Sequence, residues 1–413
     1  MDAGLRRFFW QPPRTHRDVV PARRVSFLEL FYDLIYVVMI ARVAELLHHD
    51  ITFTSVLNFA ILFGLLWVGW HNGTILADAH GRQDLRTRAL TFLQMFAITV
   101  MAVFAPTADG DGGLGFGVAY LAFLLILVVQ WVGVMLLERD DPLYGPITRQ
   151  YTLMMIGLAV VTAGSLFAEP QVRLWIWGAI VVLFVGFMAF GALVAEDTPE
   201  AGAPMATESM LERFALFVII VLGEVVAGVV AGLGAVHDLS PNVFLTGFAG
   251  LAVGMALWWT YFDMLSERPP RESVRARFFY NLLQLPLTMA IAGVGAVTVA
   301  LIEGAAEVDD AANWAFVFFV ALAEITVIAI GSLLRDRAKL AAMFRPAAVT
   351  GVIVAGFALL LPLLHPTGLL LSAILLVAMS VQWVICVRGW LRTPDGQEAL
   401  AGSNASLARE GEV

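Results

Sequence analysis

The chain has 413 residues, of which 60% are hydrophobic and only 14% are charged, and its formal net charge is −9. Soluble globular domains carry about 25% charged residues, so this composition excludes an ordinary soluble protein and indicates one embedded in a membrane. The single cysteine, Cys386, excludes a disulfide framework and a cysteine-based metal cluster.

Twelve apolar segments along the chain are long enough to cross a bilayer as α-helices, which requires about 20 mostly apolar residues. In chain order these segments are residues 27–48, 51–76, 87–105, 114–137, 150–168, 172–195, 210–234, 241–264, 276–302, 311–333, 344–364 and 367–389. The short connections leave little room for a soluble domain. We therefore predict an all-α polytopic membrane protein with about twelve transmembrane helices.

The placement of Lys and Arg predicts the orientation of these helices. If the N-terminus lies inside and twelve spans alternate, the inner segments hold 22 of the 25 Lys and Arg residues. The outer loops then hold Arg173 alone, and Arg42 and Arg213 lie within helices. Because Lys and Arg favour the cytoplasmic side of a membrane, we expect both termini in the cytoplasm.

Two halves of the chain carry the same polar pattern. The sequence SFLELF at residues 26–31 corresponds to SMLERF at residues 209–214, an offset of 183 residues. The segments that begin at Arg88 and Arg277 share Arg, Leu and Thr at equal spacing, with an offset of 189 residues. We expect two parallel six-helix repeats, a design known among transporters.

The predicted domains are a basic cytoplasmic tail at 1–26, the first repeat at 27–195, a cytoplasmic linker at 196–208, the second repeat at 209–390 and a disordered cytoplasmic tail at 391–413.

Carboxylates within the first predicted helix are candidate functional groups, because charged side chains at lipid depth are costly and usually functional. Glu29 and Asp33 lie four residues apart on one side of the helix, and Tyr36 continues that face. The functional interpretation is a proton or cation site, or a contact with a polar substrate. The alternatives are an interfacial Glu29 near the helix N-terminus and a structural hydrogen bond from Asp33 to a neighbouring helix.

Four further charged residues lie within predicted helices and are candidate ion or substrate contacts. Arg42 has Glu45 three residues later as a local partner, and a pair between Arg42 and Glu224 across the two halves is the alternative. Arg213 and Glu224 are eleven residues apart and share one helix face. Glu324 lies near the middle of its helix without a local cation, so we expect it to be protonated if it is buried.

Aromatic and imidazole side chains complete the candidate site. Trp67 and Trp70 lie inside the second helix rather than at its membrane end, and Trp258 and Trp259 are their counterparts in the second half. We interpret these four as the lining of a cavity. His71 is a candidate proton relay, with an interhelical hydrogen bond as the structural alternative.

No metal and no cofactor are expected. The chain has only seven histidines, and no two of them have a helical spacing suited to a shared metal or haem. The motifs that bind nucleotides are missing from the sequence, and we expect no nucleic acid as a partner. The expected partners are the lipid bilayer and a small solute or proton.

Residues 25–36, VSFLELFYDLIY, resemble the opening signature of the bacterial low temperature requirement A family, and residues 212–224, ERFALFVIIVLGE, resemble its second signature. Residues 67–72 are similar to the tryptophan-rich second helix of that family. Ala215 stands where the family often has Gly, and Gln284 stands where a histidine is expected, which argues against histidine chemistry there. The resemblance implies a multi-pass protein of the bacterial inner membrane that is linked to growth at low temperature.

Two classes of function fit this pattern. The first is secondary transport of a small polar or ionic solute, with or without coupling to protons. The second is a non-transporting sensor or scaffold, or a membrane enzyme that acts on lipid. A cavity that opens sideways to lipid favours the second class, and one that opens to water favours the first.

Overall fold

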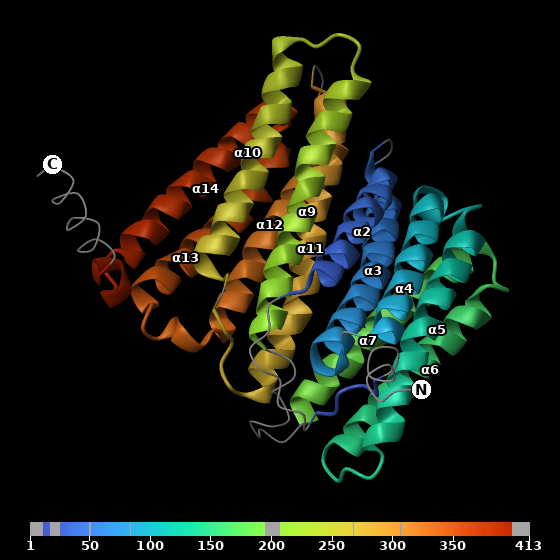
Figure 1. Ribbon diagram of the computed structural model, residues 1–413. Coiled ribbons are helices and arrows are strands. Elements are labelled where there is room, and N and C mark those ends of the chain that lie inside the picture. The colour runs from blue at the N-terminus through green and yellow to red at the C-terminus, as the bar shows by residue number, and fades with distance from the viewer. Residues whose placement is uncertain are drawn as a thin grey trace, which may run out of the picture. The chain divides into compact units, whose positions relative to one another are not determined.

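The computed structural model describes residues 11–16, 25–48, 51–82, 84–194, 207–266, 268–305 and 308–398, and these residues fold into α-helices joined by short loops, without a β-strand (Figure 1). The long helices are α2 (Phe27–Ala44), α3 (Phe53–His80), α4 (Leu85–Phe104), α5 (Gly113–Glu138), α6 (Tyr144–Ser165), α7 (Pro170–Val194), α9 (Glu208–Ala235), α10 (Pro241–Met264), α11 (Val274–Glu303), α12 (Asp310–Leu333), α13 (Ala341–Ala358) and α14 (Gly368–Trp390). Short 3-10 helices follow several of them, at Glu45–Leu47, Ala105–Thr107, Arg335–Arg337 and Leu361–Leu364. Each apolar segment of the sequence therefore contains one long helix.

Ten helices of the described chain are long and apolar enough to cross a membrane. The other two long helices, α2 and α6, fall outside this set. α2 has 18 residues and carries Glu29, Asp33 and Arg42, and the first turns of α6 contain Thr148, Arg149 and Gln150. Length and composition thus support an all-helical membrane protein, with ten candidate spanning helices in the described residues.

Side chains at the N-termini determine where several helices begin. The hydroxyl of Ser26 accepts a hydrogen bond from the backbone N–H of Glu29, and the Glu29 carboxylate accepts one from the backbone N–H of Ser26. Thr52 and Ser55 make the same reciprocal pair at the start of α3. Each arrangement satisfies backbone donors that the first helical turn leaves without partners. A single side-chain cap of this kind is made by Asp84, Ser240, Asp309 and Thr367.

Contacts divide the chain into two compact units. Unit 1 comprises Met1–Glu224 and Ser273–Leu285, and unit 2 comprises Val225–Glu272 and Pro286–Val413. Two helices, α9 and α11, are each shared between the units. The units thus differ from the predicted halves, because the first parts of α9 and α11 group with unit 1. Most of the predicted linker and of the two predicted tails lies outside the described residues.

Within unit 1, α3 is the core helix. α4 packs against α2 and α5, α5 packs against α6, and α3 packs against α7. Every residue from 61 to 72 on α3 is buried. Polar side chains on this part of α3 are therefore surrounded by protein, where they must find partners.

Within unit 2, α10 packs against α14, and α13 packs against both α12 and α14. The part of α9 that belongs to this unit makes a close backbone approach to α11. A Cβ atom built on Gly228 would clash with the carbonyl oxygen of Gly295, whereas one built on Gly234 would have no atom within 4 Å. Small residues of this kind allow membrane helices to pack closely.

We expect Gly228→Ala to destabilise the protein by about 1–3 kcal/mol, because the added methyl group meets backbone that cannot move aside as a side chain would. Gly234→Ala lies on the same helix and is the matched control, with an expected gain of up to about 1 kcal/mol from helix propensity. Thermal unfolding of both variants in detergent measures the difference. Equal unfolding temperatures would contradict the close approach of the two helices.

Candidate functional site

Asp33 and Arg213 form an ion pair in the interior of unit 1. Nη2 of Arg213 donates a hydrogen bond to Oδ1 of Asp33 over 2.9 Å, and each side chain is only 1% exposed. The indole Nε1 of Trp70 donates to the same carboxylate oxygen over 2.9 Å. Helices α2, α3 and α9 each contribute one of the three groups, so the site joins three helices.

The position of Asp33 on α2 explains why it needs a partner. It lies six residues beyond Phe27, the first residue of the helix, which is about 9 Å along the helix axis. An unpaired carboxylate buried at that depth would be strongly destabilising. The guanidinium of Arg213 supplies the compensating charge.

The ion pair leaves part of its hydrogen-bonding capacity unused. Oδ2 of Asp33, and both Nε and Nη1 of Arg213, are buried and have no hydrogen-bond partner within the described part of the chain. Buried polar atoms are nearly always hydrogen-bonded, and each unpaired one costs about 1–3 kcal/mol. Two guanidinium donors and one carboxylate oxygen are thus available to a small polar group.

Aromatic side chains hold the ion pair in place. Trp70 stacks on Phe217 with their ring centroids 4.0 Å apart, and the guanidinium carbon of Arg213 lies 5.8 Å from the centroid of Trp70. That distance is within the range of a cation–π interaction. The hydroxyl groups of Tyr32 and Tyr36 lie 3.3 Å apart on the adjacent turns of α2. The charged groups therefore sit among rigid rings, which fixes their geometry.

A cavity of about 670 Å³ reaches Arg213. We call it the α2–α4 cavity, because its wall includes the first turns of those helices together with the end of α3. The polar residues of the wall are Ser26, Glu29, Tyr32, Arg82, Thr87, Arg88, Thr91, Gln94 and Arg213. Three arginines against one glutamate give the wall a positive charge. Three rim residues, Phe27, Phe31 and Phe92, are exposed by 91%, 48% and 44%.

Asp78, near the end of α3, holds the first turn of α9. It accepts hydrogen bonds from the hydroxyl groups of Thr207, over 2.7 Å, and of Ser209. Ser209 and Arg213 lie four residues apart and so share one face of α9. Asp78 therefore orients the helix that carries Arg213 toward Asp33.

The charged residues at the other end of α2 form a separate group. Arg42 pairs with Glu45, the local partner that their spacing predicts, and its Nε donates to the carbonyl oxygen of Ala102 over 3.4 Å. Glu224 is only 4% exposed and makes no hydrogen bond or ion pair with another described residue. The alternative pair between Arg42 and Glu224 is not formed.

Trp67 and His71 belong to the packed core of α3. Their rings stack with centroids 4.5 Å apart, and both are fully buried. Nε2 of His71 lies 3.3 Å from Oδ1 of Asn281 on α11, which is the interhelical hydrogen bond weighed as the structural alternative. Neither Trp67 nor Trp70 lines the α2–α4 cavity, so the expectation of a cavity lining by these two residues is corrected to core packing around the ion pair.

Three candidate residues of the predicted second half, Trp258, Trp259 and Glu324, lie in unit 2. Nε2 of Gln382 donates to Oε2 of Glu324 over 2.7 Å, while Oε1 of Glu324 is buried without a partner. Gln382 and Trp259 help to line a cavity of about 290 Å³ between α10 and α14. Trp258 is 43% exposed and stacks on Phe262. Glu324 thus has as its partner a neutral amide, and the residue that supplies it, Gln382, lines a small cavity.

The structure therefore divides the candidate residues among four places. Glu29, Asp33, Tyr36, Trp70 and Arg213 lie at or beside the ion pair, and Trp67 and His71 lie in the core around α3. Arg42 and Glu224 belong to the group at the other end of α2, and Trp258, Trp259 and Glu324 lie in unit 2. Tyr32 and Gln382 also lie at these sites and were not predicted from the sequence as site residues. Tyr32 could have been found because it is a polar residue directly before Asp33 in the sequence. Gln382 could not, because no local sequence pattern relates it to Glu324.

These features define a polytopic α-helical membrane protein with buried polar sites. The family model described as bacterial low temperature requirement A protein (LtrA) matches residues 24–381. The chain belongs to the LtrA family, as its two signatures indicate. It is also 30% identical to uncharacterized protein RA0937 of Rhizobium meliloti (strain 1021) over 282 residues, which cover 65% of this chain and 67% of that relative.

Asp33→Asn and Arg213→Gln should each destabilise the protein by about 3–5 kcal/mol, because each leaves one buried charge without its counterion. The double variant should lose less than the sum of the two, which a double-mutant cycle of unfolding free energies measures. The control cycle uses Arg139 and Asp140, an exposed pair whose side chains are 70% and 87% accessible, with an expected coupling below about 1 kcal/mol. Additive effects of Asp33→Asn and Arg213→Gln would rule out the ion pair.

Proposed function

We propose that this protein is a proton-coupled secondary transporter of a small anionic solute, and that the α2–α4 cavity receives the negative group of that solute. The observation that carries this proposal is the buried guanidinium of Arg213, which lines the cavity and has two unused donors. A guanidinium presents its N–H groups in a fork that fits a carboxylate or a phosphate. Arg82 and Arg88 in the same wall add attraction for an anion.

Asp33 supplies the coupling to protons in this proposal. Its Oδ2 has no hydrogen-bond partner in the described part of the chain, while its Oδ1 accepts from Arg213 and Trp70. Protonation neutralises the carboxylate and weakens its attraction for the guanidinium. Arg213 then has its full charge available for the solute, so the proton and the anion favour each other's binding.

The proposed architecture has twelve spans in two six-helix repeats of the bacterial inner membrane, with both termini in the cytoplasm. Equivalent helix pairs support the repeat. In each half the second helix packs against the sixth, namely α3 against α7 and α10 against α14. The fourth helix likewise packs against the fifth, namely α5 against α6 and α12 against α13. The distribution of Lys and Arg supports the orientation. In that orientation the first turns of α2 and α4, and with them the α2–α4 cavity, face the cytoplasm.

A second candidate function rests on the rim of the same cavity. The exposed rings of Phe27, Phe31 and Phe92 would suit the acyl chain of an anionic lipid whose headgroup binds Arg213. In that case the protein is a lipid-responsive sensor or scaffold, or an enzyme that acts on lipid, and it moves no soluble solute.

A bulky side chain in the wall distinguishes transport from these alternatives. Thr91→Trp places an indole in the α2–α4 cavity and should reduce uptake of the transported anion into proteoliposomes at least about 10-fold. Thr99→Trp is the matched control. Thr91 and Thr99 lie two turns apart on α4 and make the same hydrogen bond, over 2.9 Å, to the carbonyl oxygen four residues earlier, but Thr99 is exposed and lies outside the cavity.

The assay uses a panel of labelled carboxylates and phosphates, with and without an inward proton gradient. Uptake that depends on the gradient, falls in Thr91→Trp and persists in Thr99→Trp supports the proposal. If no anion of the panel moves, and anionic lipid copurifies with the wild type but not with Thr91→Trp, the lipid function replaces transport.

A further inference from the structure

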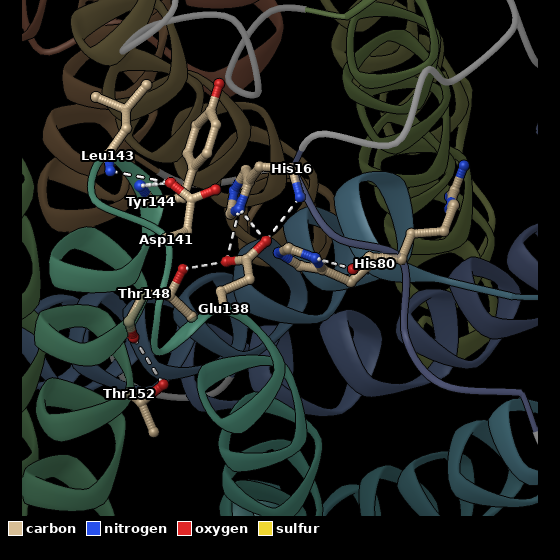
Figure 2. Close-up of polar contacts among 9 residues, drawn as sticks. His16, His80, Glu138, Asp141, Leu143, Tyr144, Thr148 and Thr152 are labelled. Carbon is tan, nitrogen blue, oxygen red and sulfur yellow. Dashed lines mark hydrogen bonds and ion pairs between the residues drawn. The ribbon is translucent and has the colours of Figure 1, made fainter.

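Three metal-ligating side chains from distant parts of the sequence meet at one end of unit 1 (Figure 2). His16 belongs to the described segment 11–16, His80 is the last residue of α3, and Glu138 is the last residue of α5. One ligand atom from each residue lies within 4.8 Å of the other two. Spacing along a single helix predicts no pair of histidines suited to a metal, but the fold brings His16 and His80 together from two separate segments.

His80 is oriented as a metal ligand would be. Its Nδ1–H donates to the carbonyl oxygen of Arg14 over 2.8 Å, which leaves the lone pair on Nε2. His80 is only 3% exposed, and Nε2 is buried without a hydrogen-bond partner in the described structure. Figure 2 shows the ring of His80 next to the carboxylate of Glu138 and near the ring of His16. Histidines that bind metals usually donate their second ring N–H to a carbonyl or carboxylate in this way.

Glu138 is held by neighbours that also orient His16. The hydroxyl of Thr148 donates to Oε2 of Glu138 over 2.6 Å, and the backbone N–H of His16 donates to Oε1 over 2.6 Å. Nδ1 of His16 lies 2.8 Å and 2.9 Å from the two carboxylate oxygens, and its ring stacks on Tyr144 at 4.6 Å. Figure 2 shows these contacts converging on one carboxylate. Both the carboxylate and the ring of His16 are therefore pre-positioned.

We propose that His16, His80 and Glu138 bind a divalent transition metal ion of the zinc type. Two imidazole nitrogens and one carboxylate are a donor set that zinc favours, with a fourth position open to water or another ligand. Calcium and magnesium prefer oxygen donors and fit this set poorly. Zinc bonds of about 2.0–2.1 Å place ligand atoms about 3.3 Å apart, so the cluster closes by small side-chain movements.

The metal ion also gives the unpaired nitrogen a partner. A simple hydrogen bond between His16 and Glu138 would anchor the N-terminal segment but would leave Nε2 of His80 buried and unsatisfied, which is unfavourable. Coordination uses that nitrogen and ties the segment 11–16 to the ends of α3 and α5 with one ion.

Metal binding would fix one wall of a second cavity. Pro13 and His80 help to line a space of about 430 Å³. This space shares Thr87, Thr91 and Gln94 with the α2–α4 cavity. The ion would therefore act on the surroundings of the proposed solute site without contacting the solute, and its binding does not depend on the transport proposal.

The test is metal binding by the purified full-length protein after treatment with a chelator. We expect one equivalent of Co²⁺ to bind with the visible absorption of a four- or five-coordinate site, to be displaced by Zn²⁺, and to raise the unfolding temperature. His80→Asn retains an amide N–H in the place of Nδ1–H but lacks Nε2, and Glu138→Gln retains an acceptor for Thr148. Each should weaken binding at least about 100-fold, and Thr148→Val should weaken it about 10- to 100-fold, as loss of a group that orients a ligand does.

His237→Asn is the control, because His237 is exposed and lies outside the cluster, and it should bind as the wild type does. Metal-free unfolding temperatures show whether each variant is folded, and if Glu138→Gln unfolds early, His80→Asn and Thr148→Val carry the test. The proposal is overturned if the wild type binds well below one equivalent, or if His80→Asn binds as tightly as the wild type. Either result would leave His16 and Glu138 as a hydrogen-bonded anchor alone.

Discussion

The ion pair between Asp33 and Arg213 is the constraint on which unit 1 depends. It links residues 180 positions apart and lets α2, a short helix with three charged residues, pack inside an apolar protein. The pair forms only if α9 is correctly rotated, and the hydrogen bond that the Ser209 hydroxyl donates to Asp78, one turn before Arg213, helps to set that rotation. Two polar contacts of α9, at Ser209 and at Arg213, thus attach the same face of this helix to α3 and to α2.

The features that could be predicted from the sequence are those set by local spacing. The helices follow from runs of apolar residues, the cap of α2 follows from Ser26 and Glu29, and Arg42 found Glu45 three residues away. The partner of Asp33 was not predictable in this way. Arg213 lies so far from Asp33 along the chain that no periodic pattern relates the two. From the sequence alone, a pair between Arg42 and Glu224 was as reasonable as the pair between Arg213 and Asp33.

The roles of α3 residues were misjudged for a related reason. Amphipathic spacing shows which face of a helix meets the protein, but residues 61–72 of α3 are buried on every side and carry no such signal. A tryptophan there could equally line a cavity or fill the core. His80 shows the same difficulty at the end of the helix, where its neighbours come from segments 66 and 58 residues away, at Arg14 and Glu138. Sequence spacing describes one element at a time, whereas both polar clusters are assembled at the junctions of several.

Under the proposed two-repeat architecture, the two halves differ where the ion pair lies, and this difference bears on the proposed function. At the offset of 183 residues, Asp33 corresponds to Leu216 and Arg213 corresponds to Leu30. If the two repeats were identical, the protein would carry the ion pair twice or not at all. Instead, each half contributes one charged partner and has a leucine at the position that corresponds to the other partner. Apolar side chains of similar volume would stabilise such a site at least as well as a buried ion pair. Stability alone therefore does not account for one charged site in the two proposed repeats, whereas the proposed binding of a single polar ligand would.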